Sequence, residues 1–395
     1  MARSVKALIN PELLEWARST AHMSLAEAAK KAKVTEEKLA AWEAGKDAPT
    51  VAKLRLLAKA YRRPLSVFYL PERPLDFAPL KDFRRLPGEV AGFLSPRLAA
   101  EIRMAHERRQ FALELYEELG EEAPRLQMQA RVTDDPEEIG GELRRLLGVT
   151  LDEQREWADP RVAYNGWREK IEALGVLVFQ LSRIPVSEVR GFAIANDGVV
   201  PVVAVNAKDS YTARSFSLVH EFAHLVLGES SISDFDESTG QAPRFEGVDR
   251  IEVFCNAVAA ATLLPREEFL REPLVAAHEV GAWSDEDLET LARAYGVSPH
   301  AVLRRLLTVG KTSREFYQRK LRQYEEEAAQ LAARKAKGGP APHVAALANL
   351  GGGYARLVFE GYYNRRLTLA DVSGQLNLKV SHIPRLEAAA FGRAA

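Results

Sequence analysis

The segment SFSLVHEFAHLVLGE (215–229) places two histidines, His220 and His224, four residues apart in an otherwise apolar run. On a helix, residues at this spacing lie on one face, so both imidazoles would point at one spot and could bind a divalent metal through nitrogen. Glu221 is rotated by about a third of a turn from His220 and can reach a water beside the metal. This H-E-x-x-H pattern is typical of sites in which zinc polarises water and the glutamate takes its proton.

A catalytic zinc usually has three protein ligands and one open position. The segment RIEVFCNAVAAATLLP (250–265) is a second apolar helix by its pattern, and Glu252 is the one acid in it. We therefore expect Glu252 to be the third ligand. Asn256, four residues later, shares its face and could hold a histidine ring nitrogen in place. The alternative to a working hydrolase is a vestigial or regulatory metal site.

Short strands are expected directly before the histidine helix. VLVFQ, GFAIA and VPVVAV, between 176 and 206, are rich in apolar residues and are broken by Pro, Gly and NDG, which indicates strands and a hairpin. These strands would place a sheet edge beside the metal, where an extended substrate can align. Helices are expected at about 96–120, 136–148, 153–174, in several pieces from 251 to 308, at 314–336, and in a helical C-terminal region.

The first 70 residues predict a compact bundle of four short helices. Good N-terminal signals precede each of them, among them Asn10 before Pro11 and the capping box of Ser24 and Glu27. Residues 1–63 carry thirteen Lys and Arg against seven Asp and Glu. Such a basic module suits nucleic-acid binding, and its alternative is a solvated helical surface.

Composition fits a globular protein with more than one domain, since the chain has 395 residues, 47% of them hydrophobic and 28% charged. No apolar run is long enough to cross a membrane, and Cys255 is the one cysteine, which excludes an internal disulfide framework. We expect a cytoplasmic protein with no membrane partner. The sequence predicts no particular oligomeric state.

At these residues the chain resembles the ImmA/IrrE metallopeptidase family, through RSFSLVHEFAHLVLGE, the preceding VVAVN, and the E-x-x-x-N helix that ends in LLP. LARAYGVSPHAVLRRLL resembles the helix-turn-helix-like segment that follows such a peptidase core. The resemblance implies a gluzincin-like fold, Zn²⁺ bound by His220, His224 and Glu252, and Glu221 as general base. It also implies a narrow substrate, a repressor protein whose cleavage releases stress-response, DNA-damage or mobile-element genes.

Residues 9–70 resemble an Xre-type (Cro/repressor-like) helix-turn-helix domain. The fold expected for the whole chain is therefore α+β and mostly helical. The expected regions are an Xre-like domain at 1–72, a linker and helical segment at 73–155, a peptidase domain at 156–310 with a small sheet, and a helical region at 311–395.

The recognition helix of the Xre-like domain would start at VTEEKLAAWEAG, so the positions facing a partner are Thr35, Glu36, Glu37 and Lys38, with Lys46 further on. Two carboxylates facing a phosphate-lined groove weaken DNA binding. Specific DNA binding and docking on another protein therefore both stay open for this domain.

Arg214, Tyr211 and His278 are candidates to stabilise the oxyanion formed when water attacks a carbonyl, and each could equally be structural. The first expected function is a zinc endopeptidase that cuts a regulatory protein. One alternative is a non-enzymatic DNA-binding regulator that uses the peptidase fold for sensing. Another is the antitoxin of a toxin–antitoxin pair, with a toxin as partner.

Overall fold

The computed structural model describes residues 5–74, 80–82, 94–157, 159–233, 248–331 and 340–392. The chain divides into two compact units, Met1–Pro79 with Val90–Glu107, and Leu80–Glu89 with Arg108–Ala395. Helix α5 (Pro96–Leu119) contributes its first half to the first unit and its second half to the other. The division of residues 73–395 into three regions stays a prediction.

The first unit is the expected helical bundle, with α1 (Pro11–Thr20), α2 (Leu25–Ala32), α3 (Glu36–Glu43), α4 (Val51–Tyr61) and a 3-10 turn at Leu65–Tyr69. The side chains of Asn10, Ser24, Thr35 and Thr50 each accept a hydrogen bond from the first turn of the helix that follows, which explains where the helices begin. Trp42 and Tyr61 are buried in its core.

The second unit is built on a five-stranded sheet of order β1-β5-β3-β4-β2. Its strands are β1 (Lys81–Asp82), β2 (Leu177–Leu181), β3 (Gly191–Ile194), β4 (Val202–Asn206) and β5 (Ser231–Ser233). β2 runs parallel to β4, and β3 pairs antiparallel with both β4 and β5. The hairpin predicted at NDG is confirmed: it joins β3 to β4 through Asn196–Gly198.

Of the three strands expected before the histidine helix, β2 forms an edge of the sheet, and a sheet edge beside the metal stays a prediction. β4, the strand that leads into the histidine helix, lies between β3 and β2, so it is an inner strand rather than an edge. Among the described strands, the outer ones are β1 and β2. All five residues of β4 are buried, because helices cover both faces of the sheet.

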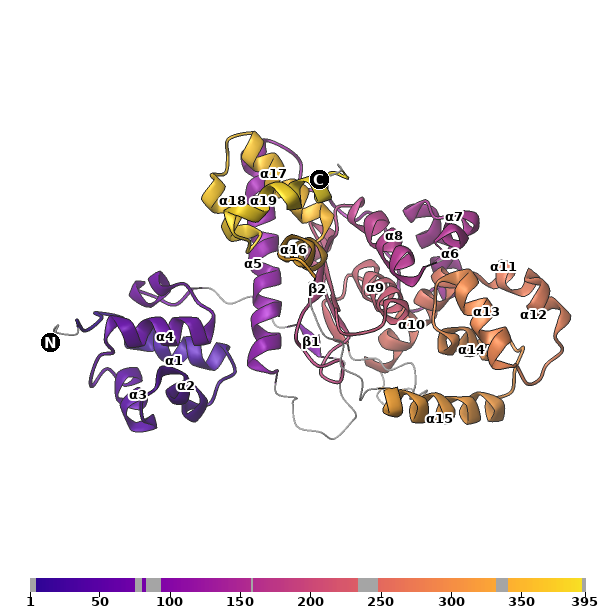
Figure 1. Ribbon diagram of the computed structural model, residues 1–395, viewed down its shortest axis with the longest axis horizontal. Coiled ribbons are helices and arrows are strands. Elements are labelled where there is room, and N and C mark those ends of the chain that lie inside the picture. Colours follow the sequence, from indigo (N-terminus) through magenta and orange to yellow (C-terminus); the bar gives the residue numbers. More distant parts are fainter. Residues whose placement is uncertain are drawn as a thin grey trace. The chain divides into compact units, whose positions relative to one another are not determined.

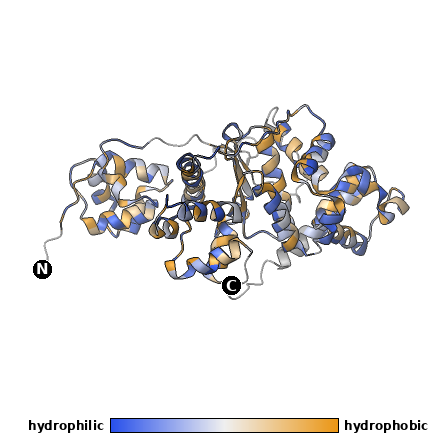
Figure 2. Ribbon diagram, turned by 90° about the horizontal axis from the view of Figure 1, so that it is seen from above, coloured by the Kyte–Doolittle hydropathy of each residue, from blue (hydrophilic) through white to orange (hydrophobic). Residues whose placement is uncertain are grey.

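On one face of the sheet lie α8 (Pro160–Glu172) and α9 (Tyr211–Val226), and α10 (Val248–Leu263) packs behind them with α6 (Pro136–Leu147) (Figure 1). Val203 and Val205 of β4 share a core with Leu218 and Phe222 of α9. The apolar and hydrophilic residues of the helices separate onto opposite sides (Figure 2), as packing against a core requires. This layer fixes α9 and α10 against each other.

Helices α6 and α10 approach closely because a glycine lies at their contact. A Cβ added to Gly140 would lie 2.6 Å from the Cβ of Ala261. The small residues of α10 thus permit tight packing, which holds this helix in one position relative to α9.

The opposite face of the sheet is covered by the second half of α5 and by α16 (Pro342–Leu350) and α17 (Gly352–Tyr363). Phe179 of β2 meets Tyr354 of α17, with ring centroids 5.7 Å apart. The chain ends in α18 (Leu369–Gln375) and α19 (Ile383–Ala390), which extend this helical group.

The remaining helices are α7 (Leu151–Glu156), α11 (Arg266–Arg271), α12 (Pro273–Ala277), α13 (Asp285–Tyr295), α14 (Pro299–Thr308) and α15 (Arg314–Leu331). The single helix predicted at 153–174 is wrong, because the segment forms α7 and α8. Asp159 caps a new helix and Pro160 occupies its first turn, where a proline is tolerated. The α+β, mostly helical fold is confirmed. Within the described residues, no helix has both the length and the apolar character needed to cross a bilayer.

Candidate metal centre

Helix α9 is anchored at its start by polar contacts and along its length by apolar packing. Ser210 caps it by accepting a hydrogen bond from the amide of Ala213. Asn206, at the end of β4, is buried and donates to the carbonyl oxygen of Val189 at 2.8 Å, which fixes the turn before the helix. The histidine face of α9 is thereby held in a defined orientation.

His220, His224 and Glu252 come together in the core. Among the described residues, these three form a group of potential metal ligands, and their ligand atoms all lie within 4.8 Å of one another. The Nε2 atoms of the histidines are 3.1 Å apart, and the Glu252 carboxylate lies 3.3 Å from Nε2 of His220 and 3.1 Å from Nε2 of His224. Two ligands of one tetrahedral zinc would be about 3.3 Å apart, so the spacing fits.

The donor set also fits a divalent cation electrostatically. Burial raises the pKa of Glu252, but the two histidines outweigh it and the net pKa is lowered, so the carboxylate is ionised. Burial lowers the pKa of both histidines. For His224 this effect of burial is the larger one, so its pKa is lowered. For His220 the attraction to Glu252 raises the pKa overall. A cation would replace the protons that these buried groups now share.

Glu221 is buried beside this group without joining it. It is 1% exposed, and its Oε2 accepts a hydrogen bond of 3.2 Å from the hydroxyl of Ser231 on β5. The carboxylate is thus oriented from the sheet, while His220 and His224 on the same helix point at the candidate metal position. This arrangement suits a base that acts on a water rather than a metal ligand.

Gly191 of β3 makes room for Glu221. A Cβ at this position would lie 2.7 Å from Oε1 and 2.8 Å from Cγ of Glu221, and 3.0 Å from the carbonyl oxygen of Ala204. Sequence reasoning missed both Gly191 and Ser231. A glycine inside a strand pattern is a signal of close approach, and it could have pointed to Gly191; nothing local singled out Ser231.

Replacing Gly191 with alanine is expected to move Glu221, because the side chain yields more easily than the backbone. We expect Gly191→Ala to slow hydrolysis by roughly a hundred-fold, the scale of a displacement of about 1 Å at a reacting group, while metal content stays unchanged. Cleavage rates and metal analysis would check this. Gly141→Ala is the control, since a Cβ at Gly141 meets no atom within 4 Å. If Gly191→Ala and Gly141→Ala cleaved at equal rates, Gly191 would have no role in positioning Glu221.

Asn256 lies one turn after Glu252 on α10, as predicted. A hydrogen bond donated by the ring of His220 to the side chain of Asn256 is among the influences that raise the pKa of His220. Its buried Oδ1 has no other hydrogen-bond partner in the described part of the chain. Its task of holding the His220 ring for a metal stays a prediction. Cys255 is fully buried, and burial raises the pKa of its thiol, as expected of an inert core cysteine.

The contacts of Arg214, Tyr211 and His278 favour their structural alternative. Arg214 donates to the carbonyl oxygens of Asp209 and Ala207 and lies 4.4 Å over the ring of Tyr211, so it braces the turn before α9. His278 stacks on Trp283, with ring centroids 4.2 Å apart. Its described partners lie between α12 and α15 rather than on α9 or α10.

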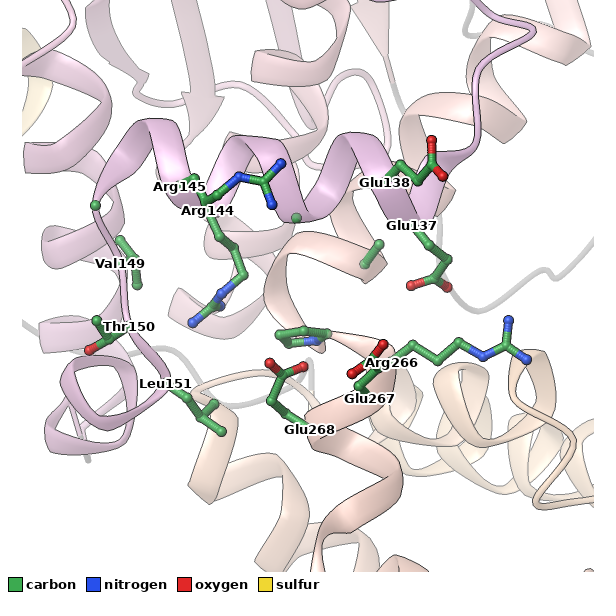
Figure 3. A pocket seen from close by; sticks show the side chains of 14 residues that line it. Glu137, Glu138, Arg144, Arg145, Val149, Thr150, Leu151, Arg266, Glu267 and Glu268 are labelled. Carbon is green, nitrogen blue, oxygen red and sulfur yellow. The ribbon is translucent and has the colours of Figure 1, made fainter.

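A cavity of about 660 Å³ lies between α6, α7 and α11, away from these residues (Figure 3). Arg144 on its wall is 8% exposed and donates to Gln154 and to the carbonyl oxygen of Thr262. Arg144 therefore ties α6 to the end of α10. None of the three candidate ligands lines this cavity.

In the first unit, the predicted partner-facing residues Thr35, Glu36, Glu37, Lys38 and Lys46 are all exposed. Thr35 also caps α3 by accepting from the amide of Lys38. Glu36 and Glu37 lie in the first turn, where carboxylates stabilise the helix dipole, so they have a structural reason to be acidic.

The chain thus combines a helical bundle with an α+β domain that carries a candidate metal centre. Residues 171–307 match the family described as the IrrE N-terminal-like domain, a peptidase family, and residues 14–68 match the helix-turn-helix family. The two matched segments correspond to the expected fusion of an Xre-type helix-turn-helix domain with an IrrE/ImmA-like peptidase domain. Peptidases of this family are metal-dependent. No curated protein and no solved structure matches the chain.

Proposed function

We propose that the protein is a zinc-dependent endopeptidase that cuts a regulatory protein, such as an Xre-type repressor, in stress response or in the control of mobile elements. The observation that carries this proposal is the convergence of His220, His224 and Glu252 beside Glu221, inside a peptidase-family domain. The donor set and its spacing suit Zn²⁺.

A Zn²⁺ held by His220, His224 and Glu252 would supply Lewis acidity towards the attacking water and the scissile carbonyl. Glu221 accepts the proton of that water and passes it to the leaving amine. The hydroxyl of Ser231 donates a hydrogen bond to one carboxylate oxygen of Glu221 and so helps to orient the carboxylate for this proton transfer. The buried surroundings strengthen these interactions, because the local dielectric constant is low.

A repressor is the proposed substrate because the chain carries a helix-turn-helix domain of its own. This domain would bring the peptidase to DNA where repressors are bound, or would dock on the repressor directly. Both routes raise the local concentration of the substrate and explain a narrow specificity.

Cleavage of a purified Xre-type repressor encoded beside this chain would test the proposal. We expect two fragments, no cleavage after a chelator has removed the metal, and full recovery when Zn²⁺ is added back. The Glu221→Gln protein, purified in parallel, controls for contaminating peptidases. Cleavage at an unchanged rate in the presence of the chelator would contradict the metal-dependent reaction.

A non-enzymatic DNA-binding regulator or antitoxin is the second candidate, favoured by the exposure of α3 in a matched helix-turn-helix domain. In that case the metal centre would serve in sensing or would stabilise the fold, and it would not catalyse peptide hydrolysis. Gel shifts with DNA from the chain's own upstream region, at stated salt, would then be unaffected by Glu221→Gln, and no repressor fragment would form.

A further inference from the structure

Helices α18 and α19, outside both matched segments, repeat the backbone geometry of the N-terminal helix-turn-helix. Thr368 caps α18 in a capping box with Asp371, as Ser24 caps α2 with Glu27. Lys33 (φ 56°) follows Ser24 at the same spacing at which Asn377 (φ 47°) follows Thr368, and both residues have the left-handed backbone conformation. The N-cap position of the next element follows two residues later in both cases, at Thr35, whose side chain caps α3, and at Lys379, whose side chain makes no capping hydrogen bond.

The hydrogen bonds of the two turns also correspond. The amide of Val34 donates to the carbonyl oxygen of Ala29 at 3.0 Å, and that of Leu378 donates to Ser373 at 3.1 Å. In the first unit, this turn belongs to a domain matched as a helix-turn-helix. The second element of the C-terminal motif, a 3-10 turn at Val380–His382 that continues into α19, therefore has the position of a recognition helix.

Shape alone does not make such a motif a binding surface, as α13 and α14 demonstrate. Gly296 (φ 64°) and the bond from Val297 to Ala292 form the same turn there. However, Val302, Leu303 and Leu306 of α14 belong to the main core. Helix α14 packs against α13 and α15, so this copy of the motif serves packing.

The outer face of the C-terminal motif is exposed and basic. Lys379, Ser381 and Arg385 are exposed on the second element, while Ile383 and Leu386 face the core. Arg365 and Arg366, also exposed, directly precede α18.

Two acids, Asp371 and Glu387, lie on these two elements, so the four basic residues outnumber them. Asp371 is held by the Thr368 amide and hydroxyl, and Glu387 accepts from the hydroxyl of Tyr363. By contrast, the first turn of α3 presents Glu36 and Glu37. Of the described helix-turn-helix surfaces, the C-terminal one is thus better suited in charge to a phosphate backbone.

We propose that the α18–α19 surface binds double-stranded DNA. The start of the second element, with Lys379, Ser381 and Arg385, would enter the major groove. Arg365 and Arg366, before the first helix of the motif, would contact the flanking phosphates. The chain would then hold DNA through its C-terminal helices, in addition to any contact made by its N-terminal domain.

Binding of the full chain to a random-sequence duplex, followed by fluorescence anisotropy over a range of salt, tests this proposal. Removing the two phosphate contacts, in Arg365→Ala/Arg366→Ala, should lower the slope of log affinity against log salt by about two. Lys379→Ala/Arg385→Ala should weaken binding roughly ten-fold. The control pair Arg145→Ala/Arg271→Ala removes the same charge from exposed sites on α6 and α11 and should change neither.

A photo-crosslinking residue placed at Ser381 gives a direct readout, and we expect it to capture DNA. The same residue at Val162, which is 50% exposed on α8, should not. The proposal is overturned if both C-terminal variants keep the affinity and salt slope of the control pair, or if no DNA is captured at Ser381. A surface that captures only protein would overturn it as well.

Discussion

Glu221→Gln is expected to slow peptide hydrolysis by about a thousand-fold while the protein keeps its full complement of bound metal. Glutamine has nearly the same shape as glutamate and can still contact the hydroxyl of Ser231. It cannot accept the proton of the attacking water, and general-base catalysis contributes about 10²–10⁴ in rate. Glu221 lies outside the group of candidate ligands, so its loss of charge should spare metal affinity.

Single-turnover cleavage together with metal analysis of the same sample would measure both quantities. The unaltered protein from a parallel purification sets the reference. A Glu221→Gln protein that cleaves at the normal rate would exclude this residue as the base, and one that has lost its metal would make it a ligand instead.

His224→Ala is expected to remove both the metal and the activity. The ring is fully buried, and its Nε2 lies 3.1 Å from both Nε2 of His220 and the Glu252 carboxylate. Its removal takes away one of three ligands and leaves the buried carboxylate with one imidazole partner fewer. We expect a stability loss of roughly 1–3 kcal/mol even without metal, because a buried acceptor loses a partner.

His300→Ala provides the matched control for this variant. His300 lies on α14 beside Tyr317, so the same chemical change is made outside the candidate centre. Metal content, cleavage rate and thermal unfolding should stay near those of the unaltered protein. If His224→Ala retained stoichiometric zinc, the assignment of this ligand would be wrong.

The candidate centre could be predicted where local periodicity controls geometry. The four-residue spacing of His220 and His224 guarantees a common face on any helix. Glu252 could be selected because it is the one acid in the apolar segment 250–265, and a buried carboxylate needs a partner. The structure places these three side chains together.

Features that depend on contacts between distant segments could not be predicted in this way. Gly191 and Ser231 reach Glu221 from two strands of the sheet, and their pairing in that sheet is a tertiary property. The position of β4 inside the sheet escaped prediction for the same reason, since a buried strand and an edge strand share one apolar pattern. The break before Pro160 was visible in the sequence, but helical periodicity on both sides concealed it.

Anomalous diffraction at the zinc edge from crystals of the full chain would test the central claim most directly. We expect one strong peak about 2.1 Å from Nε2 of His220, Nε2 of His224 and a carboxylate oxygen of Glu252, with Glu221 outside bonding distance of the metal. Zinc bound at any other residues, or crystals soaked in zinc that show no peak among these three side chains, would contradict it.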